Sequence, residues 1–355
     1  MIKYSNKVRN KDITMNELKE IAKLNGFTQK QLAFSANIKY TTLLSMAKTP
    51  VSNWNEVAKK NIATTLDMSV SDFENAIEGH FMSPFVKWVG GKRQLLPELV
   101  KHMPKDGYNK YYEPFIGGGA LLLRLAPKNA VINDLNMELV NAWQSVRDNL
   151  DELSALLLTH EKQDTKLHYL KLRSADRDGR ITKMSYVERG ARFIYMNKAG
   201  FNGLWRENKD GQNNVPYGSH KTLKLVTESL KSVSEYLNRS NIIISNKDYR
   251  EAISDAKRGD FVYFDPPYIP VNVTSSFTNY TKDGFGLVQQ EQLRDTALNL
   301  TKYGVKVMIS NADVPLIKDL YADPVFKIHH VKASRSINSD ASKRGKIGEV
   351  IITTY

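Results

Sequence analysis

From Phe85 onward, the chain alternates short apolar segments with helical segments and glycine-rich turns. The apolar segments have the length and composition of buried strands. The predicted strands are residues 111–115, 130–132, 242–244, 261–264, 305–309 and 350–352, with a helix over 119–125. Strands that alternate with helices favour a doubly wound, mostly parallel sheet, so the expected class is α/β.

Two parts of the chain depart from this alternation. Residues 145–237 are helical and charged, and they become rich in Asn and Gly between Asn197 and Gly218, which indicates an inserted recognition subdomain. Residues 1–80 have the pattern of a small all-α domain instead. Its helices are predicted at 15–24, 28–36, 40–47, 54–66 and 71–77. The breaks at Gly79-His80 and Ser83-Pro84 therefore predict two domains, residues 1–80 and 84–355.

The composition narrows the kind of partner. A formal net charge of +13 and a pI near 9.5 favour a polyanion, either a nucleic acid or a membrane surface. The sequence contains no long apolar run, and its N-terminus lacks the features of a signal peptide. We therefore expect a soluble protein that is not exported and that resides in the cytoplasm.

Redox and zinc chemistry are disfavoured by the residues present. Because the chain has no cysteine, it can form neither a disulfide nor a thiolate nucleophile. The seven His are scattered rather than paired at metal-ligand spacing, so no metal site is expected.

Two loops that follow predicted strands carry the chemistry. In parallel sheets, ligands bind beyond the carboxyl ends of the strands. The first loop, residues 113–120, contains three successive glycines, which either let the backbone approach a ligand or simply form a flexible turn. Asp134, after the next strand, is placed to accept hydrogen bonds from a ribose. The glycine spacing fits an adenosyl group better than a dinucleotide or a triphosphate.

The second loop is Asp265-Pro266-Pro267-Tyr268, which follows an apolar strand. Its prolines fix the backbone, so that the Asp carboxylate and a neighbouring carbonyl offer two acceptors to the two N–H donors of a primary amine. Tyr268 adds an aromatic face on which a flipped nucleobase can stack. An ordinary Pro-Pro turn is the alternative interpretation of these four residues.

Together these motifs resemble the DNA adenine methyltransferase (Dam) family over residues 84–355. The segment Phe85-Val86-Lys87-Trp88-Val89-Gly90-Gly91-Lys92 is similar to its opening cofactor motif, and Asp265 to Tyr268 are similar to its catalytic motif. The resemblance implies a Rossmann-like methyltransferase sheet that binds S-adenosylmethionine. It implies catalytic roles for Asp265, Pro266 and Tyr268, and cofactor contacts for Trp88, Lys92, Phe115, Gly117, Gly119, Asp134, Asp248 and Asp265.

The resemblance also implies double-stranded DNA as the partner, commonly read at GATC, and no membrane partner. The DNA-contacting residues that it implies are Lys87, Phe201, Asn202, Arg206, Asn208, Pro216 and, in a basic hairpin near the C-terminus, Arg335. Arg206 can offer a fork to guanine, and Phe201 can wedge into the stack left by a flipped base. This chain departs from the family at Ser219-His220, where relatives often carry an aromatic residue, which puts a DNA contact there in doubt.

The N-terminal helices resemble a different family, the lambda-repressor-like helix-turn-helix proteins, with residues 40–47 as the helix that would enter the major groove. Residues 1–80 hold 11 Lys plus Arg against 8 Asp plus Glu, a net charge of only +3. Packing or dimerisation is therefore the alternative role for this domain. For the whole chain, the alternatives are an RNA or protein-glutamine methyltransferase, or a DNA-binding regulator with an inactive methyltransferase domain. A cognate restriction endonuclease is a further candidate partner, and the sequence sets no oligomeric state.

Overall fold

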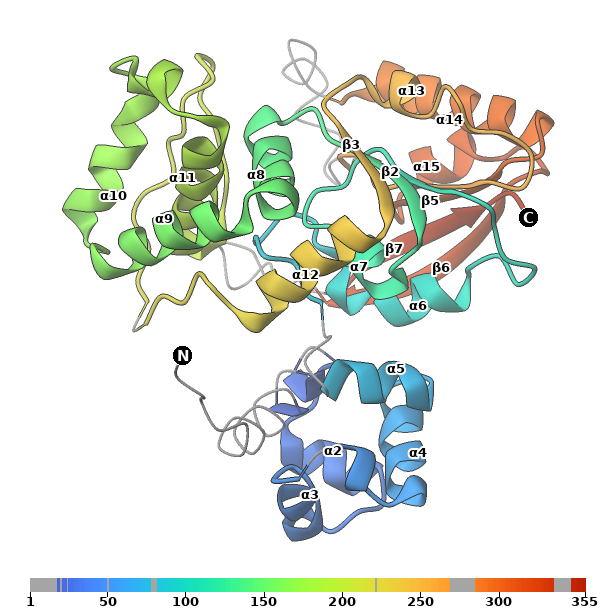
Figure 1. Ribbon diagram of the computed structural model, residues 1–355. Coiled ribbons are helices and arrows are strands. Elements are labelled where there is room, and N and C mark those ends of the chain that lie inside the picture. The colour runs from blue at the N-terminus through green and yellow to red at the C-terminus, as the bar shows by residue number, and fades with distance from the viewer. Residues whose placement is uncertain are drawn as a thin grey trace. The chain divides into compact units, whose positions relative to one another are not determined.

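The computed structural model describes residues 18–19, 21–23, 25–49, 51–77, 82–220, 222–268, 285–334 and 346–355 (Figure 1). The described residues form two compact units. The smaller unit consists of the residues up to Ser83 together with Thr227–Val233, and the larger unit consists of Pro84–Val226 and Ser234–Tyr355.

The smaller unit is built from short helices. They are α2 (Gln29–Ser35), α3 (Tyr40–Met46), the 3-10 turn η1 (Val51–Asn53), α4 (Glu56–Thr65) and α5 (Val70–Asn75). Thr28 begins α2 with a capping box, in which its hydroxyl accepts from Gln31 N and the Gln31 side chain accepts from Thr28 N. Asn55 caps α4 in the same region of the chain. These caps explain why helices this short begin within two residues of their predicted starts.

A small apolar core holds these helices together. Leu32, Leu43 and Ile62 are fully buried, and Trp54 packs 5.8 Å from the buried Phe73 ring. The four helices predicted between residues 28 and 77 are thus confirmed to within two residues at their ends. The helix predicted at 15–24 lies mostly outside the described residues.

The larger unit contains a seven-stranded sheet. Its strands are β1 (Tyr111–Glu113), β2 (Asn129–Asn133), β3 (Asn241–Ser245), β4 (Phe261–Phe264), β5 (Lys306–Ala312), β6 (Lys327–Ser334) and β7 (Lys346–Thr353). They lie in the order β3-β2-β1-β4-β5-β7-β6. The first five are parallel, whereas β7 runs antiparallel to both β5 and β6. The expected mostly parallel sheet is confirmed.

β1 is an inner strand of the sheet, between β2 and β4. Its middle residue, Tyr112, is in register with Val131 of β2 and with Val262 of β4. Every residue of β1 and β4 is buried, as expected for strands covered on both faces. Pro114 ends β1 two residues earlier than predicted, because a proline nitrogen cannot donate to a neighbouring strand.

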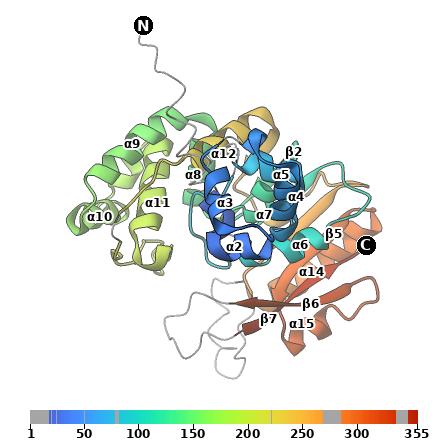
Figure 2. The same cartoon turned by 90° about the horizontal axis from the view of Figure 1, so that it is seen from below.

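Helices cover the sheet and frame the loops at its strand ends (Figures 1 and 2). They are α6 (Leu96–Lys101), α7 (Ala120–Leu125), α8 (Met137–Asp148), α13 (Tyr249–Ala252), α14 (Leu287–Lys302) and α15 (Pro315–Leu320). The helix α12 (Glu228–Arg239) belongs to the smaller unit up to Val233 and to the larger unit from Ser234. Side chains of α13, α14 and α15 form one buried cluster with Tyr112, Val262 and Ile309 of the strands. None of the helices among the described residues is long and apolar enough to cross a membrane.

Between α8 and α12 the chain forms a helical group with α9 (Leu150–Lys162), α10 (Lys166–Arg173) and α11 (Tyr186–Ala199) (Figure 1). Short 3-10 turns lie at η3 (Lys92–Gln94), η4 (Ser174–Asp176), η5 (Arg180–Lys183) and η6 (Phe201–Gly203). Ser185 and Glu188 begin α11 with a capping box. Most of α11 is buried, so this helix is the core of the group and fixes the loop that follows it.

Candidate active site

The two loops singled out in the sequence and the loop that carries Asp134 lie side by side in the fold. They follow β1, β2 and β4, which are adjacent parallel strands with their carboxyl ends at one edge of the sheet. The chain continues outward from β1 to β2 on one side and from β4 to β5 on the other, so β1 and β4 form a topological switch point. The fold therefore brings the glycine loop, Asp134 and Asp265 to the place where α/β sheets bind ligands.

Asp265 is tied to the opening motif of the larger unit. The Lys92 ammonium lies 2.8 Å from Asp265 Oδ1, and 19% of the Asp265 side chain is exposed. Lys92 is itself buried and donates a second contact, 2.7 Å long, to the Gly90 carbonyl. Burial raises the pKa of Asp265, and the charge of Lys92 opposes that rise. The charge of Lys92 thus favours the ionised form of Asp265 in a loop that is largely shielded from water.

Tyr268 is oriented by two contacts from different parts of the chain. Its hydroxyl donates to Glu349 Oε2 at 3.0 Å, and the Lys92 ammonium lies 4.7 Å from its ring centroid. Burial raises the pKa of Tyr268 well above its usual range, so the phenol stays a donor. Glu349 belongs to β7, and it is a site residue that the sequence analysis did not identify.

The prolines between them are fixed by a buried amide pair. Pro266 is buried, and the Gln290 side chain donates to the Pro267 carbonyl at 2.9 Å. Asn311 Nδ2 in turn donates to Gln290 Oε1 at 3.0 Å. Gln290 and Asn311 are completely buried, so their hydrogen bonds hold the loop with little competition from water. Neither residue was identified from the sequence, because only the tertiary fold brings α14 and β5 to this loop.

The glycine loop owes its composition to two tryptophans as well as to its backbone. Gly117 and Gly119 have φ angles of 47° and 67°, in the left-handed region. A Cβ on Gly117 would lie 2.6 Å from the Trp88 indole, and one on Gly119 would lie 2.6 Å from the Trp143 indole. The Trp143 indole also donates to Gly117 O at 3.1 Å. Close packing of the indoles is therefore a reason for these glycines, beside the ligand approach expected from sequence.

Asp134 closes the loop from the neighbouring strand. Its Oδ2 accepts from Gly117 N at 3.1 Å and its Oδ1 accepts from Asn136 N at 2.9 Å. Burial raises the pKa of Asp134, and these two N–H donors oppose the rise. Each carboxylate oxygen keeps a further lone pair for another donor. These remaining acceptor positions fit a group that carries hydroxyls, as an adenosyl ribose does.

Aromatic side chains lie beside Asp134. The Phe115 ring is 5.3 Å from Tyr249 and 5.6 Å from Phe285, both unidentified from sequence. Asp248, just before Tyr249, caps α13 through Arg250 N and pairs with the Arg250 guanidinium at 2.8 Å. That hydrogen bond holds the pKa of Asp248 below its usual range. Phe115 thus contacts Tyr249, the residue next to Asp248, but the Asp248 carboxylate is already committed to local contacts.

Glu113, the last residue of β1, is a further buried carboxyl at this edge. Its Oε2 accepts from Tyr111 OH at 2.7 Å and from Leu122 N at 3.1 Å. Burial raises its pKa to about 8, with Asp265 adding to the rise. Glu113 is therefore mostly protonated at neutral pH, which avoids two ionised carboxyls beside one Lys92.

The segment expected to read DNA follows α11 as an exposed loop. Phe201 is 48% exposed, and Asn202 has a φ of 55°, a left-handed conformation that Asn tolerates. Arg206 is exposed, and its Nε donates to Asn214 Oδ1 at 2.6 Å. Asn208 is a turn former instead of a free side chain, because its Oδ1 accepts from the backbone of 210 and 212.

The rest of this segment is anchored from behind. The buried Asn197 accepts from Lys87 N at 2.8 Å and donates to Lys87 O at 2.8 Å and to Gly203 O at 3.1 Å. Pro216 is exposed, and its carbonyl accepts from Phe201 N at 2.9 Å. The fold thus brings Lys87, Phe201 and Pro216 to one loop cluster, through an Asn197 that sequence reasoning left unassigned. Arg335 and the predicted basic hairpin lie outside the described residues.

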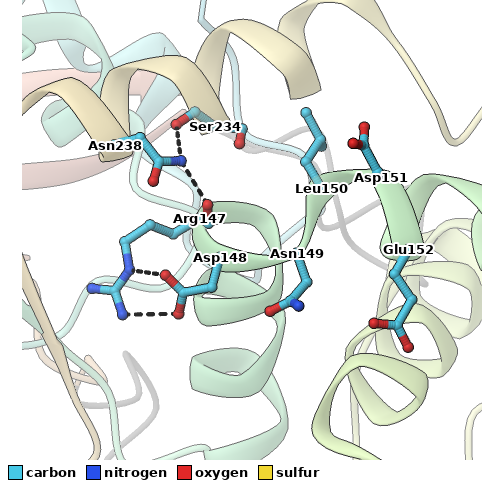
Figure 3. Close-up of a pocket in the computed structure, with 8 residues that line it drawn as sticks. All are labelled: Arg147, Asp148, Asn149, Leu150, Asp151, Glu152, Ser234 and Asn238. Carbon is cyan, nitrogen blue, oxygen red and sulfur yellow. Dashed lines mark hydrogen bonds and ion pairs between the residues drawn. The ribbon is translucent and has the colours of Figure 1, made fainter.

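An open cavity of about 550 Å³ lies away from these loops, where α8 meets α9 (Figure 3). Its lining residues are Arg147, Asp148, Asn149, Leu150, Asp151, Glu152, Ser234 and Asn238. Figure 3 shows the Arg147 guanidinium paired with Asp148, at 2.7 Å, and Asn238 bonded to the Arg147 carbonyl, at 2.6 Å. No predicted site residue lines this cavity, and four of its lining residues pair among themselves, namely Arg147, Asp148, Ser234 and Asn238.

The sheet and the loops at its edge define a class of protein. A mostly parallel sheet whose antiparallel β7 lies between β5 and β6 is consistent with the fold of S-adenosylmethionine-dependent methyltransferases. Its loops after β2 and β4 carry carboxylates suited to a ribose and to an amine.

Comparison with known proteins identifies the family. The model of the D12 class N6 adenine-specific DNA methyltransferases matches residues 88–337. The chain is 52% identical to the type II methyltransferase M1.LlaDCHI of Lactococcus lactis subsp. cremoris over 275 residues, which are 77% of this chain and 96% of that protein. It is 39% identical to the type II methyltransferase M.MjaIII of Methanocaldococcus jannaschii, over 77% of this chain and 99% of that one. It is 33% identical to a DNA adenine methylase of Salmonella typhi, over 75% and 93% of the two chains.

The chain therefore belongs to the D12 class N6 adenine-specific DNA methyltransferase family, as the resemblance of its motifs implied. The family match begins at residue 88 and so includes none of the N-terminal helices.

Proposed function

We propose that this protein transfers a methyl group from S-adenosylmethionine to the N6 amine of an adenine flipped out of duplex DNA. The placement of Asp265 carries the proposal, because its carboxylate lies after β4, 2.8 Å from Lys92 and next to the Pro266 carbonyl. An amine with two N–H donors matches these two acceptors. Membership of an adenine-specific family supports adenine as the base and DNA as its carrier.

The residues that would hold the methyl donor are those around the glycine loop. Asp134 would accept from ribose hydroxyls, Phe115 would contact the adenosyl ring, and Trp88, Lys92, Gly117 and Gly119 would surround the methionine portion. Asp248 is the weakest member of this set, because Arg250 already occupies its carboxylate. When bound, S-adenosylmethionine supplies an electrophilic methyl group on a sulfonium sulfur.

The chain's own contribution is to orient and activate the amine. The adenine N6 lone pair is delocalised into the ring, which makes it a weak nucleophile. Two acceptors on its N–H groups, Asp265 and the Pro266 carbonyl, localise that lone pair and fix its direction. The Asp265 carboxylate is also placed to receive the proton that the methylated amine releases. Tyr268, held by Glu349, offers its face for stacking on the base.

We assign sequence reading to the loop after α11. Arg206 would approach guanine, Phe201 would fill the gap left by the flipped base, and Lys87 would add a second guanine contact. The exposure of Phe201 and Arg206 supports this assignment. We propose GATC as the target, because the motifs resemble enzymes that read it. The names of two relatives as type II methyltransferases support a restriction-modification setting with a cognate endonuclease.

We further propose that the N-terminal helices bind DNA as a helix-turn-helix. In support, α2 and α3 are joined by only four residues, 36–39, as in that motif. Tyr40, at the start of α3, is 38% exposed and available for contact. Lys39→Glu should weaken binding of the full chain to duplex DNA and leave methyl transfer at saturating DNA unchanged, whereas unchanged binding would favour a packing role.

The main proposal is tested by sequencing the methylated adenines in DNA from cells that express the chain. N6-methyladenine within GATC is the expected product. In a purified assay with labelled methyl donor, Asp265→Ala should incorporate no methyl group while it still binds duplex DNA. The matched control is Asp255→Ala, which removes an exposed carboxylate paired with Lys110.

Other outcomes of the same assay distinguish the alternatives. Label that appears in RNA or in protein glutamine instead of DNA would overturn the DNA assignment. Binding of DNA without any methyl transfer by the wild-type chain would indicate an inactive methyltransferase domain in a regulator. Methyl transfer that persists in Asp265→Ala would remove the central role of this loop.

A further inference from the structure

Asp164, in the turn between α9 and α10, gathers three side chains of the helical group. Its Oδ1 accepts from Tyr195 OH at 2.8 Å and from Tyr217 OH at 3.2 Å. Its Oδ2 lies 2.5 Å from His220 Nε2, and the side chains of Asp164 and His220 are 12% and 18% exposed. One carboxylate thus joins α11 to the end of the loop that is proposed to read DNA, residues 200–218, called the reading loop below.

His220 lies at the position where the motif resemblance predicts a departure from the family. Its ring packs edge-on against Tyr217, with ring centroids 5.3 Å apart and planes at 71°, while its Nε2 faces Asp164. The side chain is therefore directed into the protein, toward a partly buried carboxylate. A residue in this position serves an internal contact here, which accounts for the departure without a direct contact to DNA.

Backbone contacts carry this anchor to the reading loop. Tyr217 forms an antiparallel bridge with Gly200, and Gly218 N donates to Ala199 O at 2.8 Å. A Cβ on Gly218 would lie 2.8 Å from Gly200 O, so the two segments are in close contact. Because Phe201 N also bonds to the Pro216 carbonyl, a shift of residues 216–218 moves Phe201 with them.

The other end of the loop is fixed by the same helix. Tyr195 and Asn197 both belong to α11, and Asn197 holds Lys87 and Gly203. Asn197 therefore holds the start of the reading loop, and Asp164 holds its return beside Tyr169 and Arg173, which both donate to Val215 O. Loss of the Asp164 contacts loosens residues 217–220 and leaves the loop after β4 untouched.

We propose that the Asp164–His220 pair is a specificity-determining contact, which positions the reading loop for one DNA sequence. The inference rests on the proposed function, in which this loop reads DNA. Asp164 and His220 act through Tyr217 and Phe201 and do not touch the substrate. Their loss widens the range of geometries that Phe201 and Pro216 adopt, so that near-cognate duplexes are accepted.

The test measures kcat and KM of the full chain on a duplex that contains the site it methylates. It measures the same constants on duplexes that differ from this one by one base pair. His220→Phe, which keeps a ring but loses the nitrogen, and Asp164→Asn should each reduce discrimination by about 10-fold, the order of one lost base contact. kcat on the cognate duplex at saturation should stay near that of the wild type. The double variant should lose no more discrimination than Asp164→Asn alone, since His220→Phe removes one of the contacts that Asp164 makes.

Two further variants separate positioning from general damage. His220→Gln keeps an N–H donor and should recover much of the discrimination. His330→Phe breaks another His–Asp pair, in which His330 of β6 lies 2.9 Å from Asp313. This variant should leave discrimination unchanged. Thermal unfolding of each variant reports whether it is folded.

Folded His220→Phe and Asp164→Asn enzymes that discriminate like the wild type would overturn the inference. So would an equal fall of kcat on every duplex, which is the pattern of a merely structural contact. The proposed function fails in a different way, by the absence of adenine methylation in the wild-type chain on any duplex.

Discussion

The loop after β4 and the loop after α11, which is proposed to read DNA, differ in how their functional side chains are held. At the first, the charged groups are buried and each has a partner from another part of the fold, as Lys92 has Asp265 and Glu349 has Tyr268. At the second, Phe201 and Arg206 project from a surface loop whose backbone is held from behind. Fixed charges in a dry site stabilise a developing charge, whereas base reading needs side chains that reach outward.

The comparison predicts how each region fails. Removal of a partner at the loop after β4 leaves a buried charge or amide without compensation, so the loss falls on the chemical step. Removal of a side chain in the reading loop leaves only an exposed surface, so the loss falls on the choice of sequence. The variants below test this difference, beginning with the largest expected effect.

Lys92→Met should lower kcat/KM for methyl transfer by about 10²–10³-fold. It removes the charge beside the largely buried Asp265, and breaking such a pair costs about 3–5 kcal/mol. Radiometric methyl transfer measures the effect. Lys105→Met, at an exposed lysine before β1, is the control and should act like the wild type. Near-normal transfer by Lys92→Met would contradict a paired, preorganised carboxylate.

Gln290→Leu should lower kcat by about 10-fold or somewhat more, with a smaller change in the KM for DNA. The substitution removes the donor to the Pro267 carbonyl and leaves Asn311 Nδ2 without its acceptor in the core, at a cost of about 1–3 kcal/mol. Gln292→Leu changes an exposed residue two positions along α14 and serves as the control. Equal kcat in both variants would show that the amide pair supports the fold alone.

Arg206→Ala should relax discrimination at one base pair by about 1–3 kcal/mol and leave kcat on the cognate site nearly unchanged. Among the described residues, the Arg206 guanidinium bonds to Asn214 alone, and it lies at the surface. Single-base-pair substitutions in the duplex measure the effect, and Lys209→Ala on the same loop is the control. A uniform fall on all duplexes would assign Arg206 to phosphate contact instead of base reading.

The helices α9–α11 and the surroundings of β1 should respond to pH in opposite directions. His160, 3.1 Å from His168, has its pKa lowered to about 4 by burial, so the unfolded helices bind more protons as pH falls from 6.5. Acidification from pH 7 to 5 should therefore destabilise α9–α11 by about 1 kcal/mol, since the ring is partly exposed. Amide exchange in α9–α11 measures this, and His160→Gln should flatten the response.

Around β1 the change of stability with pH has the opposite sign. Burial raises the pKa of Glu113 to about 8, so its contribution to stability is present below pH 4.5 and is lost as pH rises toward 8. Glu113→Gln should remove this loss. Identical pH responses of amide exchange near β1 and in α9–α11 would contradict the difference between the two regions.

The strands were predictable because their signals are local. The strand at 261–264 is found at its predicted residues, and those at 130–132, 242–244 and 305–309 are found within three residues of their predicted ends. β6 was missed, because it is an edge strand with Lys327, His329 and His330 in place of an apolar run. An edge strand buries only part of its surface, so composition alone does not mark it.

The predicted site residues came in part from the same local signals. Lys92, Asp265 and Tyr268 lie together in the fold, as do Asp134 and Gly117. Asn208 differs from expectation, because its carbonyl is used to shape the loop. The supporting residues Glu349, Gln290, Asn311, Asn197 and Asp164 carried no local pattern that could have singled them out.

The sequence alone determined that apolar strands would end in a glycine loop and a proline-fixed acceptor loop. Proline and glycine restrict the backbone within a few residues, so these features do not depend on the rest of the fold. Only the tertiary structure decided that Lys92 would face Asp265, that Glu349 would orient Tyr268 and that Asp164 would hold His220. Such pairs join segments far apart in the chain, and they depend on burial, which no local pattern contains.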